Sequence, residues 1–522
     1  MRRSNVLAFA VVFLGALALY VSTAAPSLTW AHASADGGDL ITAAVTNGVP
    51  HPPGYPTYVT IGQVIARLRL GDVAYRFNLF SAVCMALAAG LTALSILRLM
   101  TPTPATCPLQ EAPRFSGEGV AIIASLFFVT APMVWGQATI AEVHALNACC
   151  VALIVYLIAP IVFRREFVST GRLTLAAWLW GVALGNSITA AALAPLLIVA
   201  WWRHKASRRP AGQAGNRSFR TVLPIIAFLA GLSVYALIPL RAAQQPPVNW
   251  GNATSLDRFL ALITAEMYHG YALSTPPSEL LARLIASAQL IVTQYGWLGV
   301  ILGAAGFYCA LVSPNKNWRW LAAALALYLV FALTYSAADS ALYLIPVWMF
   351  GAWAIARGLL AITNNVPRYM PRAARVTPGT PVRSLPVGLI VLLLAFLLGP
   401  VLNALIHFPA MNLQNDLAAT EFAQAVLISA PPAAIVITEN DGHTFALWYY
   451  QHVAGQRPDL AIVDQRLAGY PWYDVMLRAQ GATPRLPEAD PPETWIDRLA
   501  QLNPGRALCV VDRASAQMSC QP

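Results

Sequence analysis

Long apolar runs constrain the fold of this chain more than any other feature. About 20 consecutive apolar residues suffice for a helix to cross the hydrocarbon of a bilayer, and such stretches recur along most of the sequence. Only 11% of the 522 residues are charged, against about 25% in a typical soluble domain. The sequence therefore predicts a polytopic α-helical membrane protein. The apolar runs lie at about 6–24, 78–98, 118–133, 141–163, 173–202, 221–240, 285–312, 319–336, 341–360 and 385–406.

The run 173–202 is too long for one crossing. Gly185-Asn186-Ser187 interrupts it, and basic residues stand at both of its ends. Because Lys and Arg collect on the cytoplasmic side, both ends are expected there, and two short helices that meet near Asn186 satisfy this arrangement. The sequence thus predicts about 11 transmembrane helices, which would put the two ends of the chain on opposite sides of the membrane.

Charged residues are divided unequally between the two predicted faces. The predicted cytoplasmic segments hold most of the loop Lys and Arg, whereas most carboxylates fall on the outer side. This positive-inside pattern predicts a multi-pass protein of the inner (plasma) membrane with a cytoplasmic N-terminus. The pattern also accounts for the net charge of +10, so we expect no nucleic-acid partner. Chemistry is expected on the outer face, where the acids gather.

The first apolar run admits two interpretations. Arg2-Arg3, the apolar stretch and Ser22-Thr23-Ala24-Ala25 resemble a secretory signal peptide with its cleavage site. The apolar core is long, however, and the loop that follows needs an anchor. We therefore favour an uncleaved first helix.

The composition changes near residue 408, where charged residues return. Ala433–Thr438 and Asp459–Asp464 are typical of buried strands on either side of a helix, an α/β pattern. Because an odd number of crossings separates this region from the cytoplasmic N-terminus, we expect it outside, in the periplasm or the extracellular space. Cys509 and Cys520 lie within it, and whether they form a disulfide is left open. The predicted domains are a membrane domain, 1–407, with outer loops 25–77 and 241–284, and a soluble domain, 408–522.

The first outer loop carries two unusual motifs. Asp36-Gly-Gly-Asp39 places two carboxylates three residues apart, so one could act as general base while the other orients it or holds a divalent cation. The alternative is that Asp36 only caps a helix. In His51-Pro-Pro-Gly-Tyr55-Pro, the prolines and the glycine restrict the backbone and present His51 and Tyr55 in a set geometry. A plain turn at the membrane surface is the alternative there.

Other polar residues lie in or beside apolar helices, where they are costly unless they face a cavity or a partner. Glu142 and His144 are two residues apart and point to different sides of a helix, so this pair does not indicate a metal site. The metal requirement stays unknown. The further candidates for substrate binding are Asn78, Gln137, Glu142, His144, Asn186, Asn249, Trp250, Asp339 and Tyr343.

Two arginines on the outer side are candidates for binding an anion. Arg76 opens the second apolar run, and Arg241 ends another. A guanidinium group matches phosphate oxygens in bidentate geometry, so a phosphate partner would explain its position on the acidic face. For Arg241, snorkelling to the membrane interface is the alternative.

A series of motifs resembles one membrane-protein family, long filed as of unknown function, that includes the plexin-directed protein O-mannosyltransferase of vertebrates. Each motif alone is weak, but their order and spacing match from about residue 30 to 475. The motifs are DGGD (36–39), HPPGYP (51–56), RFNLFSA (76–82), WGQATIAEVHALN (135–147), GVALGNSIT (181–189), IPLRA (238–242) with PVNWGN (247–252), ADSALYLIP (338–346), and ENDGHTFALWYYQHVAGQRPDLAIVD (439–464) with PWY (471–473).

The resemblance implies a GT-C type glycosyltransferase. Such an enzyme takes a sugar, mannose or another hexose, from a polyprenyl-phosphate carrier and passes it with inversion to a hydroxyl of a protein or glycan acceptor. The essential acid of the family corresponds to Asp36, and Asp39 stands where many relatives have Glu. His144 replaces a frequent Tyr, and Asn186-Ser187 replaces a frequent His, which leaves the donor headgroup and the acceptor open.

Two other function classes compete with this interpretation. Transporters and flippases of lipid-linked substrates also use broken helices and buried polar groups. Against them stand the absence of paired inverted segments in the sequence and the position of the acids outside the membrane rather than at its midplane. A scaffold that presents its outer domain would leave the polar motifs inside the helices unexplained.

Overall fold

The computed structural model describes residues 3–100, 117–206, 217–313, 317–369, 387–481, 483–487 and 492–521.

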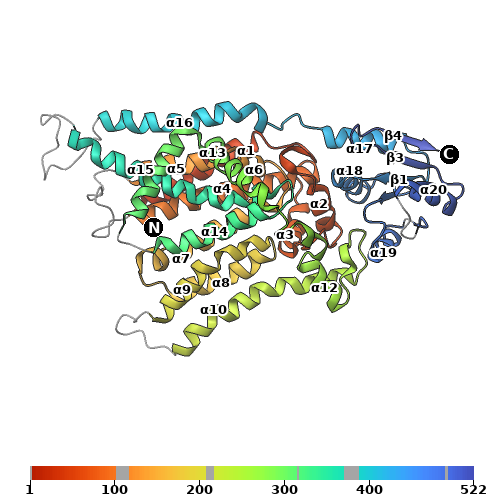
Figure 1. Ribbon diagram of the computed structural model, residues 1–522, viewed down its shortest axis with the longest axis horizontal. Coiled ribbons are helices and arrows are strands. Elements are labelled where there is room, and N and C mark those ends of the chain that lie inside the picture. Colours follow the sequence, from red (N-terminus) through yellow and green to blue (C-terminus); the bar gives the residue numbers. More distant parts are fainter. Residues whose placement is uncertain are drawn as a thin grey trace.

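A body of long helices forms one part of the molecule, and a small sheet with its own helices forms the opposite end of the long axis (Figure 1). Each apolar run of the sequence corresponds to a helix of this body. The bounds are α1 Arg3–Val21, α4 Val73–Met100, α5 Gly117–Val129, α6 Pro132–Ala138, α7 Val143–Arg164, α8 Thr170–Leu184, α9 Ala194–Ala206, α10 Arg217–Leu232, α11 Leu237–Ala242, α13 Pro277–Leu311, α14 Trp318–Thr334, α15 Ile345–Tyr369 and α16 Val387–Met411.

Seven of the described helices are long and apolar enough to cross a membrane, and the pair α5–α6, bent by 73°, raises the number to eight. The protein is thus an integral multi-pass membrane protein. The helices α8, α9 and α14 are shorter, with 15, 13 and 17 residues, so the number of about 11 crossings stays a prediction. The basic clusters of 207–216 and 370–386, which support the predicted orientation, lie outside the described residues.

The predicted break in the fifth apolar run is confirmed. Helix α8 ends at Leu184, and a 3₁₀ turn, Ile188–Leu193, leads into α9. The intervening Asn186 is fully buried, and its side-chain amide donates a hydrogen bond to the Val143 carbonyl oxygen (3.0 Å). Non-helical backbone is tolerated at this depth because protein, rather than lipid, surrounds it.

The C-terminal region has the predicted α/β pattern. The strands β1 (Ile435–Thr438) and β2 (Ala461–Asp464) are parallel and fully buried. The sequence did not reveal β3 and β4, which extend the sheet to the order β2-β1-β3-β4. Cys509 and Cys520 are opposite each other on these strands and form a disulfide, which settles the open alternative. The remaining bounds are α17 Ala418–Ser429, α18 Asp441–Trp448, α19 Pro471–Ala479, α20 Pro492–Leu502, β3 Leu508–Val511 and β4 Met518–Gln521.

Short helices of the outer loops lie between the helical body and the sheet (Figure 1). The two outer loops are joined to each other, because Val49 N–H donates to the Val248 carbonyl and Trp250 N–H donates to the Val49 carbonyl (2.9 and 3.0 Å). The first loop also contacts α18, where the Trp30 indole donates to the Gly442 carbonyl (3.1 Å). These helices are α2 Gly37–Val45, α3 Pro56–Ala66 and α12 Leu256–Ile263.

Candidate active site

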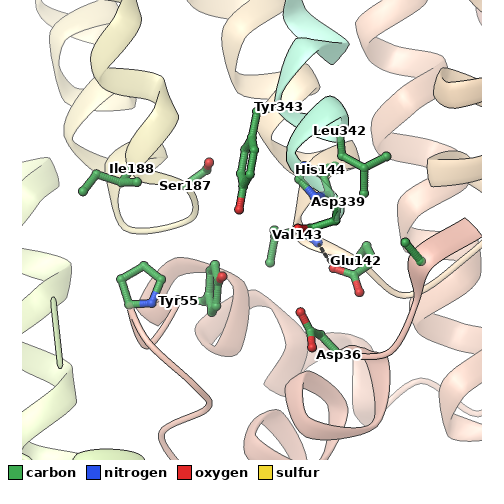
Figure 2. A pocket seen from close by; sticks show the side chains of 12 residues that line it. Asp36, Tyr55, Glu142, Val143, His144, Ser187, Ile188, Asp339, Leu342 and Tyr343 are labelled. Atoms are coloured by element: carbon green, nitrogen blue, oxygen red, sulfur yellow. Dashed lines mark hydrogen bonds between the residues drawn. The ribbon is translucent and has the colours of Figure 1, made fainter. Parts of the chain in front are cut away.

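A small, mostly enclosed cavity of about 60 Å³ lies where the first outer loop meets the start of α7, the break after α8 and the turn before α15. Figure 2 shows the carboxyl groups of Asp36 and Glu142 and the hydroxyl of Tyr343 directed into the same space. Six residues predicted from the sequence therefore meet here, although they come from distant parts of the chain. They are Asp36, Tyr55, Glu142, His144, Asp339 and Tyr343.

Asp36 stands directly before α2 but does not cap it, since its side chain makes no capping hydrogen bond among the described residues. The capping alternative is therefore wrong. A cap would have turned the carboxylate back onto the backbone N–H groups of α2. Instead, 37% of the side chain remains exposed, and that surface faces the cavity. The geometry leaves a carboxylate free to act on a ligand.

Asp39 has a different environment, because it is fully buried and does not line the cavity. One of its carboxylate oxygens, Oδ2, accepts hydrogen bonds from the ring Nδ1 and the backbone N–H of His51, at 2.7 and 2.9 Å. The other, Oδ1, accepts from the indole N–H of Trp250 at 3.1 Å. Asp39 thus holds its neighbours in place, while Asp36 faces the ligand space.

His51 lies between the two acids, with Nε2 3.4 Å from Asp36 Oδ2. Burial raises the pKa of Asp36 to about 6, and the positive charge of His51 opposes this rise. Burial alone would lower the pKa of His51, but Asp36 and Asp39 together raise it to about 9. At pH 7 Asp36 is therefore largely ionised and His51 is protonated. An ionised carboxylate beside an imidazolium is suited to general-base chemistry.

Glu142 lines the cavity, whereas the buried Asn186 does not. One Glu142 oxygen accepts from the Val143 N–H at the start of α7, and the other is buried without a hydrogen-bond partner among the described residues. The side-chain oxygen of Asn186 is also buried and has no hydrogen-bond partner among the described residues. Ser187, which follows Asn186, lines the cavity. Buried polar atoms that lack a protein partner are the groups that a polar ligand would satisfy.

Another part of the cavity wall combines rings and a carboxyl group. The His144 ring meets the Tyr343 ring edge to face, with 5.5 Å between their centroids. Asp339 precedes the 3₁₀ turn Ser340–Leu344, and burial raises its pKa. Gln137 does not line the cavity and donates from its amide to the His32 carbonyl.

Arg76 and Asn78 are placed differently from the prediction. The Arg76 guanidinium donates to the carbonyl oxygens of Ala66, Leu70 and Gly71, at 2.6, 3.1 and 2.9 Å. It therefore closes the turn between α3 and α4 and does not line the cavity. The Asn78 amide donates to two carbonyl oxygens of the first outer loop, and the residue is almost completely buried. A predicted substrate-binding role is not supported for either residue, because backbone carbonyls already occupy their donors.

Arg241 is buried, with 5% exposure, and donates to Asn47 Oδ1 and Thr60 Oγ1 (3.2 and 2.8 Å). Within the described part of the chain it forms no ion pair with a carboxylate. Thr60 lies one turn of α3 beyond Pro56, which follows the cavity residue Tyr55. Arg241 is thus a buried cation that contacts the helix following Tyr55 and has no carboxylate partner among the described residues.

Asn249 and Trp250 support the outer loops rather than line the cavity. The Asn249 amide donates to the Ala242 carbonyl and to Asn252 Oδ1. Trp250 binds Asp39 and packs against Trp472 of α19, with 5.3 Å between ring centroids. Trp250 thereby connects the acid pair to the C-terminal region.

Sequence reasoning missed the contribution of α18 to this site. Phe445 lies parallel to the His51 ring, with 6.4 Å between centroids. A Cβ built on Gly38 would lie 2.3 Å from the Phe445 carbonyl oxygen, so the second glycine of the DGGD motif is where α2 meets α18. Asn440 Oδ1 accepts a hydrogen bond from the His443 N–H, so Asn440 caps the start of α18.

No group of three or more His, Cys, Asp or Glu side chains among the described residues is arranged to hold a metal ion. Asp36 and Asp39 point in different directions, since only Asp36 faces the cavity. The divalent cation remains a prediction, and transfer assays with a chelator would test it.

Comparisons with known proteins agree with the motif series. Residues 36–210 match the model of the Protein O-mannosyl-transferase TMEM260 N-terminal domain, and residues 419–495 match TMEM260-associated domain 2. The Protein O-mannosyl-transferase TMEM260 of Mus musculus is 25% identical over 476 residues, 88% of this chain and 63% of the relative. The protein O-mannosyl-transferase tmem260 of Dictyostelium discoideum is 20% identical over 511 residues, 91% of this chain and 59% of the relative. The chain therefore spans about three fifths of the length of these relatives.

The fold is shared with ArnT from Cupriavidus metallidurans. The apo structure of ArnT has a TM-score of 0.55, with 97% of this chain and 92% of ArnT covered. The structure bound to undecaprenyl phosphate has a TM-score of 0.51, with 94% and 97% covered. At 13% identity this likeness establishes the fold alone. Residues 36–210 and 419–495 therefore resemble the TMEM260 protein O-mannosyltransferase family, and the chain shares the GT-C fold of ArnT.

Proposed function

We propose that this protein is an inverting membrane glycosyltransferase. It moves a hexose, such as mannose, from a polyprenyl-phosphate carrier to a hydroxyl of a protein Ser/Thr or a glycan on the outer face. One observation carries the proposal: Asp36 presents an uncapped, ionised carboxylate to an enclosed polar cavity, beside a protonated histidine. The names of the relatives and the undecaprenyl phosphate bound by ArnT support the same chemistry.

The reaction is a single displacement. Asp36 takes the proton of the acceptor hydroxyl as the hydroxyl oxygen attacks the anomeric carbon of the sugar. The bond from that carbon to the phosphate oxygen breaks, and the polyprenyl phosphate leaves with the electron pair. Because attack and departure occur on opposite sides of the anomeric carbon, its configuration inverts.

Arg241 is the proposed partner of the donor phosphate. Replacement by alanine should raise the KM for the lipid donor about 10- to 100-fold, since a hydrogen bond to a charged group contributes roughly 1.5–3 kcal/mol. The KM for the acceptor should change little. Transfer kinetics with each substrate varied in turn would measure both values.

Arg76→Ala is the matched control, because this outer-face arginine binds only backbone carbonyls among its described partners. It should lower stability without a change in donor KM. An Arg241→Ala enzyme with the wild-type donor KM would remove the phosphate role.

The pH dependence of kcat/KM should follow the ionisation of Asp36 and His51. Below pH about 6 Asp36 is protonated and cannot accept the acceptor proton, so kcat/KM should fall about tenfold per pH unit on that limb. Above pH about 9 His51 loses its proton and with it the attraction that holds Asp36 in place, so activity should fall to a lower plateau rather than to zero. A profile of kcat/KM from pH 4.5 to 10 at constant ionic strength would test both limbs.

The proposed orientation puts the N-terminus in the cytoplasm and residues 408–522 outside. The disulfide between Cys509 and Cys520 supports this placement, because disulfides persist in oxidising compartments. The N-terminus lies on the side of the helical body away from the sheet (Figure 1), which agrees with the same arrangement. Side-specific labelling of engineered cysteines would test the orientation.

A transporter or flippase of lipid-linked substrates is the competing function. Proteoliposomes loaded with a polyprenyl-phosphate hexose labelled in the sugar, with a hydroxyl acceptor outside, separate the two. A transferase moves the label to the acceptor, whereas a flippase moves the intact labelled lipid between leaflets. Label that crosses the bilayer without leaving its carrier would overturn the proposal.

A further inference from the structure

We propose that His51 is a positioning residue, an imidazolium fixed between two acids of the DGGD motif, that keeps Asp36 ionised and aimed into the cavity. This inference rests on the proposed function and assigns His51 a role other than the substrate binding predicted from the sequence. His51 does not line the cavity, whereas Asp36 does.

The hydrogen bonds of His51 set the orientation of its ring. Nδ1 and the backbone N–H both donate to Asp39 Oδ2, so the ring is held at two points on one side. Asp39 is held in turn by the Trp250 indole on its other oxygen. With Nδ1 committed to Asp39, Nε2 can only face Asp36, 3.4 Å away.

Rings on three different elements prevent the imidazole from turning. Tyr55 meets its edge at 5.0 Å between centroids, and Trp250 meets it at 6.2 Å. Phe445 of α18 lies parallel to it, with 11° between the planes. The imidazole itself is 6% exposed. These rings hold the imidazolium in one orientation throughout the reaction. A charge that is fixed in advance can stabilise a catalytic group without any rearrangement of the protein.

The charges that face this pair explain why a cation is needed. Asp36, Asp39 and Glu142 interact with His51, and so does Asp339. Asp441, at the start of α18, adds its negative charge to the surroundings of Asp36. Arg466 pairs with Asp441 (2.6 Å) and offsets its charge. The acids nearest Asp36 would take up protons unless another positive charge offset their repulsion. His51 is the cation in direct contact with two of them.

Protonated His51 cannot itself accept the acceptor proton, which leaves that task to Asp36. Removal of His51 should therefore change the pH at which Asp36 works rather than the identity of the base. A merely structural histidine would affect stability or rate but would leave that pH unchanged. The pH profile thus separates the two roles.

The test is the kcat/KM profile of His51→Gln in the full-length protein, with a polyprenyl-phosphate hexose as donor. Without the imidazolium, the midpoint of the acid limb should move from about 6 to higher pH by roughly 1–2 units, the size expected for a lost neighbouring charge. Activity should therefore recover in part between pH 8 and 9. The KM for the lipid donor should stay within about twofold. An acid limb at the wild-type pH would overturn the inference.

Asp39→Asn is the second variant, and it keeps the inference testable if His51→Gln does not fold. The amide can still accept from His51, but it carries no charge. The imidazolium then loses its buried counter-ion, so the alkaline limb should move from about 9 to lower pH by roughly 1–2 units. An unchanged alkaline limb would count against the positioning role of His51.

His443→Gln is the matched control. His443 is also a buried histidine at the junction with the outer loop, but it stacks on Phe422 and meets Trp30 at a tilt, and burial lowers its pKa. Both limbs should stay at the wild-type pH in this variant. A wild type that transfers no sugar would refute the proposed function. If the wild type transfers sugar and the His51→Gln variant has its acid limb at the same pH, only the role of His51 is refuted.

Discussion

Replacement of Asp36 by asparagine should lower kcat for sugar transfer by about 10²- to 10⁴-fold, the usual contribution of a general base. Asparagine has nearly the same shape but cannot take a proton at neutral pH. The substitution removes the ion pair with His51 (3.4 Å) but also the cost of burying the Asp36 charge, so the free energy of unfolding should change little. Initial rates and thermal unfolding of the purified protein measure the two effects.

Asp257→Asn provides the control for this substitution. Asp257 is an exposed acid in the first turn of α12, in the other outer loop. Its replacement removes the same charge from the outer face and should leave kcat within about twofold of the wild type. If Asp36→Asn retained wild-type kcat, the carboxylate in the cavity would not be the base.

Gly38→Ala should disrupt the contact between α2 and α18. A Cβ at this position would lie 2.3 Å from the carbonyl oxygen of Phe445 and 2.6 Å from its carbonyl carbon. Both are backbone atoms, so one helix must shift, and overpacking of this kind costs about 1–3 kcal/mol or more. Since Phe445 packs on His51, we expect at least about a tenfold loss of kcat together with lower thermal stability.

Gly469→Ala is the matched control, because a Cβ there meets no described atom within 4 Å. It should behave like the wild type in both assays. Limited proteolysis would add a structural readout, with faster cleavage near residues 408–418 in Gly38→Ala. Wild-type kcat and stability in Gly38→Ala would show that the junction does not support the site.

Features set by local composition could be predicted from the sequence. Each apolar run became a helix, because the bilayer requires backbone hydrogen bonds to be satisfied within the segment. The break at Gly185-Asn186-Ser187 was evident because these residues interrupt an apolar run. The strands β1 and β2 were evident as short apolar runs. β3 and β4 were missed, because the pairing of Leu508–Val511 with Ile435–Thr438 is a contact across some 70 residues of chain.

The candidate site was predictable as a set of residues but not as an arrangement. Asp36, Glu142 and Tyr343 could be selected because polar groups beside apolar helices require a reason. Nothing local distinguished them from Arg76, whose guanidinium instead binds three carbonyls of its own turn. The separate roles of Asp36 and Asp39 depend on Trp250, which is 211 residues from Asp39 along the chain.

Photo-crosslinking with the wild-type enzyme would show whether the sugar of the donor binds in the cavity around Asp36. A polyprenyl-phosphate hexose with a photoreactive group on the sugar, first shown to support transfer, would be irradiated with the protein in proteoliposomes and the adducts mapped by mass spectrometry. We expect adducts on the walls around Asp36, in the peptides that contain Tyr55 and Tyr343. These adducts should disappear when unlabelled donor competes for the site. Competable adducts found only elsewhere, in an enzyme that is transferring sugar, would contradict this prediction.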